Sequence, residues 1–305
     1  MKIKYKNKFG IMGMTYDTAT SKGYPGARYA PEQIRKSLQW IKNRVEDGKL
    51  FDVEANRLID MSKFEIKDFG DTSQISRYDN KQALDEIKNN IDKIYSEGYA
   101  PILLGGDHST GWPGIKALYD NTKGSIGIIH VDAHLDLVKD STIQGLYSGS
   151  SQMRRASELD RINPKNFVQV GMRSYNSPEH YHFIKDSNIT LIPANQVFET
   201  SIEETAKKAI EVASDGTDHI YMSIDIDVLD SAFAPGSGAN EPGGLTSYQL
   251  FKFVKLVAPY VDAIDIVEVN PMTDFNNMTS IVASKLLFDY ITSNYYAIEE
   301  KDSLQ

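Results

Sequence analysis

The sequence predicts an α/β protein in which a parallel β-sheet is covered by helices on both faces. Short, continuously apolar runs recur along the chain, and stretches with the apolar spacing of a helix separate them. Strands of a parallel sheet buried on both faces have this continuous pattern, whereas half-exposed strands alternate. No low-complexity linker or internal repeat interrupts the 305 residues, so we expect one domain spanning residues 1–305.

Five apolar runs are expected to form strands, namely residues 101–104, 125–131, 167–170, 219–222 and 264–267. A helix is predicted over residues 84–94, because the apolar positions there share one helical face. Gly98 predicts that this helix ends nearby. Residues 202–212 and 247–257 have the same helical pattern.

Composition narrows the chemistry and the partners. The chain has no cysteine, which excludes disulfides and thiolate metal sites, so any metal must be bound by oxygen and imidazole. The net charge is −9, which is unfavourable for binding nucleic acid. We find no signal peptide and no apolar stretch that could span a membrane, and therefore expect a cytoplasmic protein.

Three clusters of acidic residues and histidines each follow a predicted strand, where ligands of open α/β sheets bind. They are Gly-Gly-Asp-His-Ser at 105–109, His-Val-Asp-Ala-His-Leu-Asp at 130–136 and Ser-Ile-Asp-Ile-Asp at 223–227. Their candidate metal ligands are His108, Asp132, His134, Asp136, Asp225 and Asp227. A lone Asp-x-Asp is usually a turn and a lone histidine is usually structural, but three such clusters at three strand ends favour a metal site.

The spacing and the charges of these ligands favour two metals. Asp132, His134 and Asp136 occupy every second position, so in an extended segment their side chains would point the same way. Asp225 and Asp227 repeat that spacing. Six ligands exceed the three that one catalytic zinc uses. Four carboxylates balance two divalent ions, and such a centre makes a nucleophile from water at neutral pH.

With these motifs the chain resembles the ureohydrolases, the arginase and agmatinase family, over nearly its whole length. Residues 26–35 are similar to the N-terminal signature of that family, and the three clusters are similar to its metal motifs. Residues 229–238 and 241–246 resemble its substrate loop in the agmatinase style, and residues 267–271 resemble its acidic strand end.

The resemblance implies a three-layer α/β/α sandwich and two Mn²⁺ ions. One ion would be held by His108, Asp132, Asp136 and Asp225, and the other by Asp132, His134, Asp225 and Asp227. A hydroxide bridging the metals would attack the guanidinium carbon. Asp136 would carry the proton to the leaving amine, and the carboxylate of Glu268 would pair with the guanidinium. The resemblance also implies a homo-oligomer, a trimer or hexamer.

The chain departs from the family pattern in two places. Gly149 stands where many members have a histidine, which puts the proton relay in doubt. His180 or His182 could substitute, although we expect both at the surface. Residues 239–240 read Ala-Asn where agmatinases usually have Thr-Pro. His130 is interpreted as structural and directed away from the site, and Gly105 and Gly106 as allowing a tight turn.

The sequence therefore predicts a manganese-dependent hydrolase of a linear guanidino compound, with agmatine, cleaved to putrescine and urea, as the expected substrate. Asp230, Glu241 and Asp274 near the motifs favour a cationic substrate over a carboxylate. Guanidinobutyrate, formimidoylglutamate and arginine are alternative substrates. A further alternative is a catalytically weakened metal-binding homologue, because Gly149 replaces the histidine of other family members.

Overall fold

The computed structural model describes residues 3–4, 6–19, 24–73, 79–140 and 145–303. Its centre is an eight-stranded sheet with the order β4-β1-β5-β10-β9-β6-β7-β8, in which all neighbouring strands pair in parallel. The strands are β1 (Lys8–Gly13), β4 (Glu65–Asp71), β5 (Ala100–Leu104), β6 (Ile126–Val131), β7 (Phe167–Val170), β8 (Thr190–Ile192), β9 (His219–Asp225) and β10 (Ala263–Val267). A separate antiparallel hairpin consists of β2 (Lys49–Asp52) and β3 (Arg57–Asp60).

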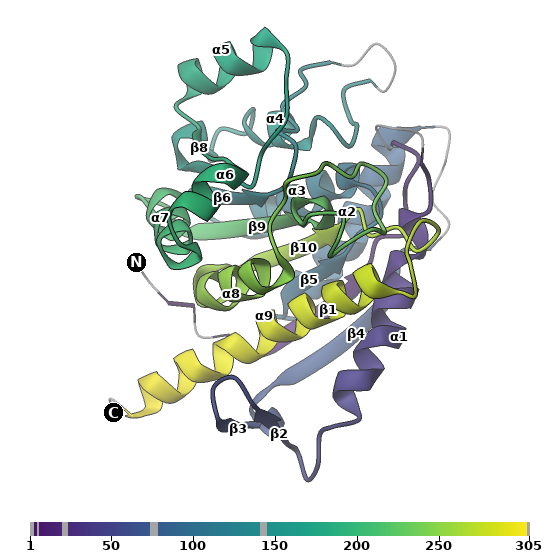
Figure 1. The fold of residues 1–305 in the computed structure, drawn as a ribbon, viewed down its shortest axis with the longest axis vertical. Coiled ribbons are helices and arrows are strands. Elements are labelled where there is room, and N and C mark those ends of the chain that lie inside the picture. Colours follow the sequence, from purple (N-terminus) through teal and green to yellow (C-terminus); the bar gives the residue numbers. More distant parts are fainter. Residues whose placement is uncertain (1–2, 5, 20–23, 74–78, 141–144, 304–305) are drawn as a thin grey trace.

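Helices cover both faces of this sheet, as Figure 1 shows. The helices are α1 (Ala30–Lys42), α2 (Asn80–Ser96), α3 (Gly111–Asn121), α4 (Gln152–Ala156), α5 (Pro178–Ser187), α6 (Ala194–Glu199), α7 (Ile202–Ala213), α8 (Ser247–Val257) and α9 (Met278–Ser303). On one face α1, α7, α8 and α9 share a core with side chains of the strands, and on the other α2 and α3 pack together. The predicted three-layer α/β/α architecture is therefore confirmed.

The predicted strands and helices are present with small shifts at their ends. The helix predicted over 84–94 is the interior of α2, and the strand predicted over 219–222 continues to Asp225. This extension matters because it brings Asp225 to the last position of the strand. Among the described residues we find no helix with the length and apolarity that a membrane span requires.

Candidate metal centre

The predicted metal ligands come from three of the four central strands, β5, β6 and β9, and Glu268 follows the fourth, β10. β5, β10, β9 and β6 end at the same edge, because parallel strands present their carboxyl ends together. His108 begins a short 3-10 turn after β5, and Asp225 ends β9. Asp227 lies in the turn that follows β9, and Asp132 follows β6 directly. The sheet thus brings together residues more than one hundred positions apart.

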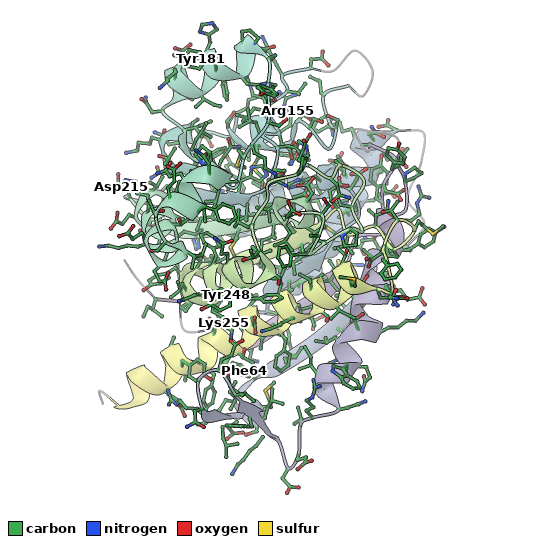
Figure 2. All side chains as sticks on the ribbon, viewed as in Figure 1. Phe64, Arg155, Tyr181, Asp215, Tyr248 and Lys255 are labelled. Atoms are coloured by element: carbon green, nitrogen blue, oxygen red, sulfur yellow. The ribbon has the colours of Figure 1, made fainter. Side chains whose placement is uncertain are left out.

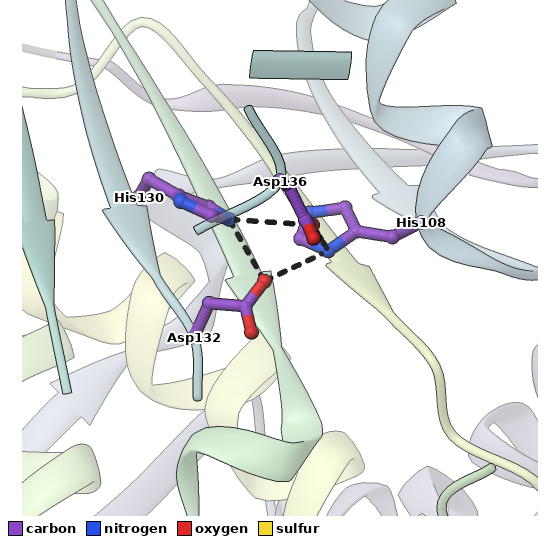
Figure 3. Close-up of side chains that lie close together, drawn as sticks. All are labelled: His108, His130, Asp132 and Asp136. Atoms are coloured by element: carbon purple, nitrogen blue, oxygen red, sulfur yellow. Dashed lines mark hydrogen bonds and ion pairs between the residues drawn. The ribbon is translucent and has the colours of Figure 1, made fainter. Parts of the chain in front are cut away.

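Three carboxylates converge on one imidazole nitrogen of His108. The Nδ1 atom lies 3.0 Å from an Oδ2 atom of each of Asp132, Asp136 and Asp225. Figure 3 shows His108, Asp132 and Asp136 facing one another, with His130 beside them. All four residues are buried. Such a convergence of oxygens on one nitrogen requires positive charge between them.

Hydrogen bonds behind His108 place a proton on its Nε2, so that in the neutral ring Nδ1 would carry the lone pair. The hydroxyl of Ser223 donates its proton to Asp265 Oδ1 at 2.6 Å, so it can only accept from His108 Nε2, which lies 2.9 Å away. With the proton on Nε2, Nδ1 of the neutral ring presents a lone pair to the three oxygens. A metal ion at that point satisfies all four atoms, and metal-binding histidines are commonly oriented by such an outer hydrogen bond.

A second group shares Asp132 with the first. His134 Nδ1 lies 3.4 Å from Asp132 Oδ1 and 3.1 Å from Asp227 Oδ2. That oxygen of Asp227 is buried, yet it accepts no hydrogen bond from any described residue. The two oxygens of Asp132 therefore face different groups of ligands, as expected of a carboxylate that bridges two ions.

The pKa values of these groups also favour the binding of positive charge. Burial, together with the neighbouring carboxylates Asp227 and Asp132, raises the pKa of Asp225 well above its ordinary value. Burial and Asp132 likewise raise the pKa of Asp227. Although burial opposes it, the neighbouring carboxylates of Asp132 and Asp227 raise the pKa of His134 to about 12. The carboxylates and imidazoles compete for protons because the buried carboxylates repel one another. Bound divalent ions would remove this repulsion. The donor set therefore fits hard or borderline divalent metals.

Glu268 lies directly after β10, between the strands that carry His108 and Asp225. Its Oε1 accepts a hydrogen bond from the backbone N–H of His108 at 2.7 Å. Burial, followed by the nearby charge of Asp107, raises the pKa of Glu268 to about 8. A buried carboxylate that is hard to ionise alone is well suited to receive a cation.

The two residues predicted to be catalytic have an unusual backbone. The φ angle is +51° at Asp136 and +61° at Glu268, in the left-handed region that non-glycine residues seldom adopt. Such conformations cost free energy and concentrate where a side chain must be held in a particular place. Gln152 adds to this by donating a hydrogen bond to Asp136 Oδ2.

Two expectations about local geometry were wrong, and the role of Gly106 has an additional reason. The segment from Asp132 to Asp136 is not extended, because β6 ends at Val131 and Asp136 is left-handed, so the ligands converge through a turn. His130 is not directed away, because positions two apart on a strand share a side, and its Nε2 lies 2.9 Å from Asp132 Oδ2. Gly106 is required by close packing, since a Cβ there would lie 1.6 Å from the carbonyl oxygen of Tyr16.

Several residues that support the site gave no signal in the sequence. Gln169 donates a hydrogen bond from Nε2 to His130 Nδ1 at 3.1 Å, which directs the Nε2–H of His130 to Asp132. Asp107 belongs to a recognised motif, but its role was not predicted: its carboxylate accepts from the backbone N–H groups of Ala19 and Ser109. Only the residues next to a motif could have been suspected from sequence.

A cavity of about 290 Å³ opens above the ligands. Its lining includes Asp136, Glu268, Gly149 and His180. We expected both His180 and His182 at the surface. His180 is instead half-buried in this cavity, whereas His182, on the same helix α5, is exposed as expected. The cavity thus contains a histidine, but on a different segment from Gly149.

The acidic residues expected to favour a cationic substrate have different positions. Asp230 accepts hydrogen bonds from the backbone N–H groups of Ala232 and Gly243, and Asp274 caps the start of α9. Both are engaged in holding loops. Glu241 lies close to the site, with Oε1 3.8 Å from His134 Nε2.

Residues 7–292 match the model of the arginase family. The chain belongs to the arginase family. It is 30% identical to a mitochondrial agmatinase of Gallus gallus over 92% of this chain and 79% of that protein. It is also 30% identical to a guanidinopropionase of Pseudomonas aeruginosa, over 92% of this chain and 85% of that protein.

Solved structures of the family share the fold. The structure of formimidoylglutamase from Bacillus subtilis superposes with a TM-score of 0.84 at 29% identity, covering 95% of this chain and 87% of that one. The resemblance to ureohydrolases and the arginase-like fold are thereby confirmed. The names of these three relatives refer to three different substrates, so membership of the family leaves the substrate open.

Proposed function

We propose that this protein is a binuclear-manganese hydrolase that cleaves the C–N bond of agmatine, giving putrescine and urea. The observation that carries the proposal is the convergence of four aspartates and two histidines on one edge of the sheet, beneath a cavity that also contains Glu268. An acidic, buried, preformed pocket of this kind suits a planar cation.

The two ions would divide the ligands as the family resemblance implies, and the two-sided position of Asp132 supports this division. His108, Asp132, Asp136 and Asp225 would hold one ion, and Asp132, His134, Asp225 and Asp227 the other. When bound, the ions supply Lewis acidity and lower the pKa of a water molecule towards neutrality. Oxygen and imidazole ligands without thiolate suit manganese.

The remaining steps belong to residues of the chain. The carboxylate of Glu268 would pair with N–H groups of the guanidinium and fix the plane of the substrate, since paired hydrogen bonds impose orientation. Asp136 would accept the proton of the attacking water, which begins the transfer of that proton to the departing nitrogen. The hydrogen bond from Gln152 keeps Asp136 Oδ2 in position for this transfer.

The charge of the cavity supports an amine-terminated substrate. None of the described residues that line it is lysine or arginine, so a substrate carboxylate would have no cationic partner among them. The nearby carboxylate of Glu241 adds negative charge at the His134 side. Agmatine ends in an ammonium group, whereas guanidinobutyrate ends in a carboxylate on a chain of similar length.

A substrate panel with the manganese-loaded protein tests this proposal. Agmatine, guanidinobutyrate and arginine are assayed by urea release, and formimidoylglutamate by release of glutamate, because its cleavage gives formamide instead of urea. We expect agmatine to have the highest kcat/KM and to exceed guanidinobutyrate at least tenfold. A preference for guanidinobutyrate or formimidoylglutamate would assign one of those substrates instead.

The alternative of a catalytically weakened homologue is tested in the same assay. A protein that binds two manganese ions but releases no product from any of the four compounds would contradict the proposed hydrolase. Turnover on the scale of seconds or faster would exclude the weakened homologue.

A further inference from the structure

The loop position occupied by Gly149 leaves the cavity without an imidazole on that side, yet proton transfer to the departing nitrogen still requires a carrier. Asp136 lies beside His108, 3.0 Å from its Nδ1, and is thereby committed to the metal side of the cavity. An amine leaves poorly unless its nitrogen is protonated, so a second group that reaches the substrate is needed.

Among the described residues that line the cavity, only His134 and His180 carry imidazoles. His134 is committed, because its Nδ1 faces Asp132 and Asp227 as a predicted metal ligand. His180 is not among the predicted metal ligands, although it lines the same cavity as Asp136. Elimination therefore leaves His180 as the imidazole that can serve the substrate.

The position of His180 on α5 suits this task. It lies in the first turn of α5, after Pro178, and its ring nitrogen Nδ1 is 3.1 Å from the hydroxyl of Ser177. That contact fixes one edge of the ring. No described residue forms a hydrogen bond with Nε2, which leaves this atom available to a ligand.

The electrostatic surroundings keep the ring neutral at rest. Burial lowers the pKa of His180, and the positive charge of Arg154 lowers it further. The negative charges of Glu179 and Asp136 raise this pKa but do not outweigh burial. These charges come from α5 itself, from the loop after β6 and from α4. A neutral imidazole can first accept a proton and then return it, as a relay requires.

His180 also lies at the junction of two hollows. It lines the metal-side cavity and a neighbouring cavity of about 1380 Å³, into which Asn176 and Leu135 also extend. Tyr181, the next residue, is exposed on α5 at the outer edge of the molecule in Figure 2. A product amine, or a small solute, can therefore reach Nε2 from the solvent side.

We propose that His180 is a catalytic residue that carries the proton to the departing amine nitrogen, in place of an imidazole at position 149. This inference rests on the proposed hydrolase function. The water oxygen forms a bond to the guanidinium carbon and gives its proton to Asp136, from which a proton crosses the shared cavity to Nε2 of His180. As the C–N bond breaks, its electron pair stays on the departing nitrogen, which takes that proton from Nε2 and restores the neutral ring.

The test compares His180→Ala with His182→Ala, a matched control that removes an exposed histidine from the same helix. We expect H180A to lower kcat on the best substrate by roughly 10²- to 10⁴-fold, the usual contribution of acid–base catalysis. KM, bound manganese and the thermal midpoint should stay close to those of the unmodified protein. H182A should retain kcat within about twofold, because an exposed side chain outside the cavity contributes little.

Two rescue experiments separate proton transfer from a structural role. Free imidazole should restore part of the H180A activity in proportion to its concentration, since the neighbouring cavity is open to small solutes. The double variant Gly149→His with His180→Ala should have a kcat at least tenfold above that of H180A, because the new histidine supplies an imidazole from the loop that contains position 149.

Each result supports or overturns a definite statement. If the unmodified protein cleaves its substrate and H180A keeps more than half of kcat, or loses manganese together with activity, the role of His180 is overturned and the hydrolase function stands. Loss of kcat with retained metal but without either rescue also overturns it. If the unmodified protein cleaves nothing in the panel, the proposed function fails and this inference fails with it.

Discussion

Glu268 combines a buried carboxylate, a left-handed backbone and a hydrogen bond from the N–H of His108. Its folded pKa of about 8 lies above the ordinary value of 4.5. An acid whose pKa is raised on folding costs stability as pH rises above the unfolded pKa, and the cost is complete above the folded pKa. In the metal-free protein this residue therefore weakens the fold progressively from about pH 4.5 to about pH 8.

Replacing Glu268 by Gln removes that cost, because the amide does not ionise. We expect metal-free Glu268→Gln to be more stable than the parent at pH 9, by a few kcal/mol as an order of magnitude, and similar to it at pH 4. Urea denaturation at both pH values in the presence of a chelator measures the difference. An equal difference at both pH values would show that ionisation of Glu268 is not its cause.

The same substitution should weaken catalysis while it strengthens the fold. Without the carboxylate the guanidinium loses its charged partner, and breaking a buried pair costs about 3–5 kcal/mol, or roughly 10²- to 10⁴-fold in kcat/KM. Manganese content should be unchanged, because Glu268 is not among the predicted ligands. Steady-state kinetics with agmatine and metal analysis check this, and parent-like kcat/KM would contradict the pairing.

Ser223 tests whether the hydrogen bonds behind His108 matter for metal binding. Ser223→Ala breaks the link between Asp265 and His108 Nε2, so the ring is no longer held as the Nδ1 lone-pair form. Loss of such an outer partner typically lowers metal affinity about 10- to 100-fold. Manganese titration measures the change.

Ser280→Ala provides the control for this experiment. Ser280 is also buried, but its hydroxyl has no hydrogen-bond partner among the described residues. We expect its removal to leave manganese affinity unchanged. Equal weakening in both variants would show a general effect of buried serine loss.

At the scale of elements, the turn after β5 depends on the close approach of Gly106 to the loop after β1. A Cβ at Gly106 would overlap the carbonyl oxygen of Tyr16, which also accepts the N–H of Asp107 at 2.9 Å. We expect Gly106→Ala to lower the free energy of unfolding by more than 2 kcal/mol, about the cost of forcing atoms into a packed site, and to weaken manganese binding.

Gly98→Ala separates this overlap from backbone strain. Gly98 follows α2 with φ +79°, and an added Cβ meets no atom within 4 Å. Its replacement should cost only about 1 kcal/mol, from the left-handed backbone alone, with manganese binding retained. Similar losses in the two variants would contradict a specific clash at Gly106.

The sequence was sufficient for the five adjacent strands from β5 to β7 and not for β4, β1 and β8 at the two sides of the sheet. β1 is buried, but Gly10 and Gly13 interrupt its apolar run. β5, β6, β7, β9 and β10 are apolar because both of their faces are covered. β4 at one edge is largely exposed, and β8 at the other has only three residues. Neither has the apolar run that identifies a buried strand, so both escaped prediction.

The site also contains residues that could be predicted from the sequence and residues that could not. The predicted ligands His108, Asp132 and Asp225 were visible because their motifs follow apolar strands. The orientation of His130 and the contact of Gln152 with Asp136 depend on turns and on packing between distant segments. Such contacts have no fixed spacing in the sequence, which is why they could not be predicted.

For the whole molecule, the density of carboxylates at the centre makes stability depend on bound ions. A ligand that binds only the folded state stabilises it by about 2.7 kcal/mol at a free concentration one hundred times Kd. We therefore expect a chelator to lower the thermal midpoint by several degrees, and excess Mn²⁺ to restore it. Calorimetry with and without chelator measures this, and an unchanged midpoint would contradict ion binding at the centre.

The position of β10 in the sheet has a consequence for how the protein is made. β10 is the last strand in the sequence, yet it lies in the middle, between β5 and β9. On the ribosome, the strands β4, β1 and β5 cannot be joined to β9, β6, β7 and β8 until residues 263–267 have emerged. A nascent chain shorter than this has two unjoined half-sheets with open inner edges, which are prone to aggregate. Insertion of one late strand therefore closes the sheet and aligns the ligands, so ion uptake must follow synthesis of almost the whole chain.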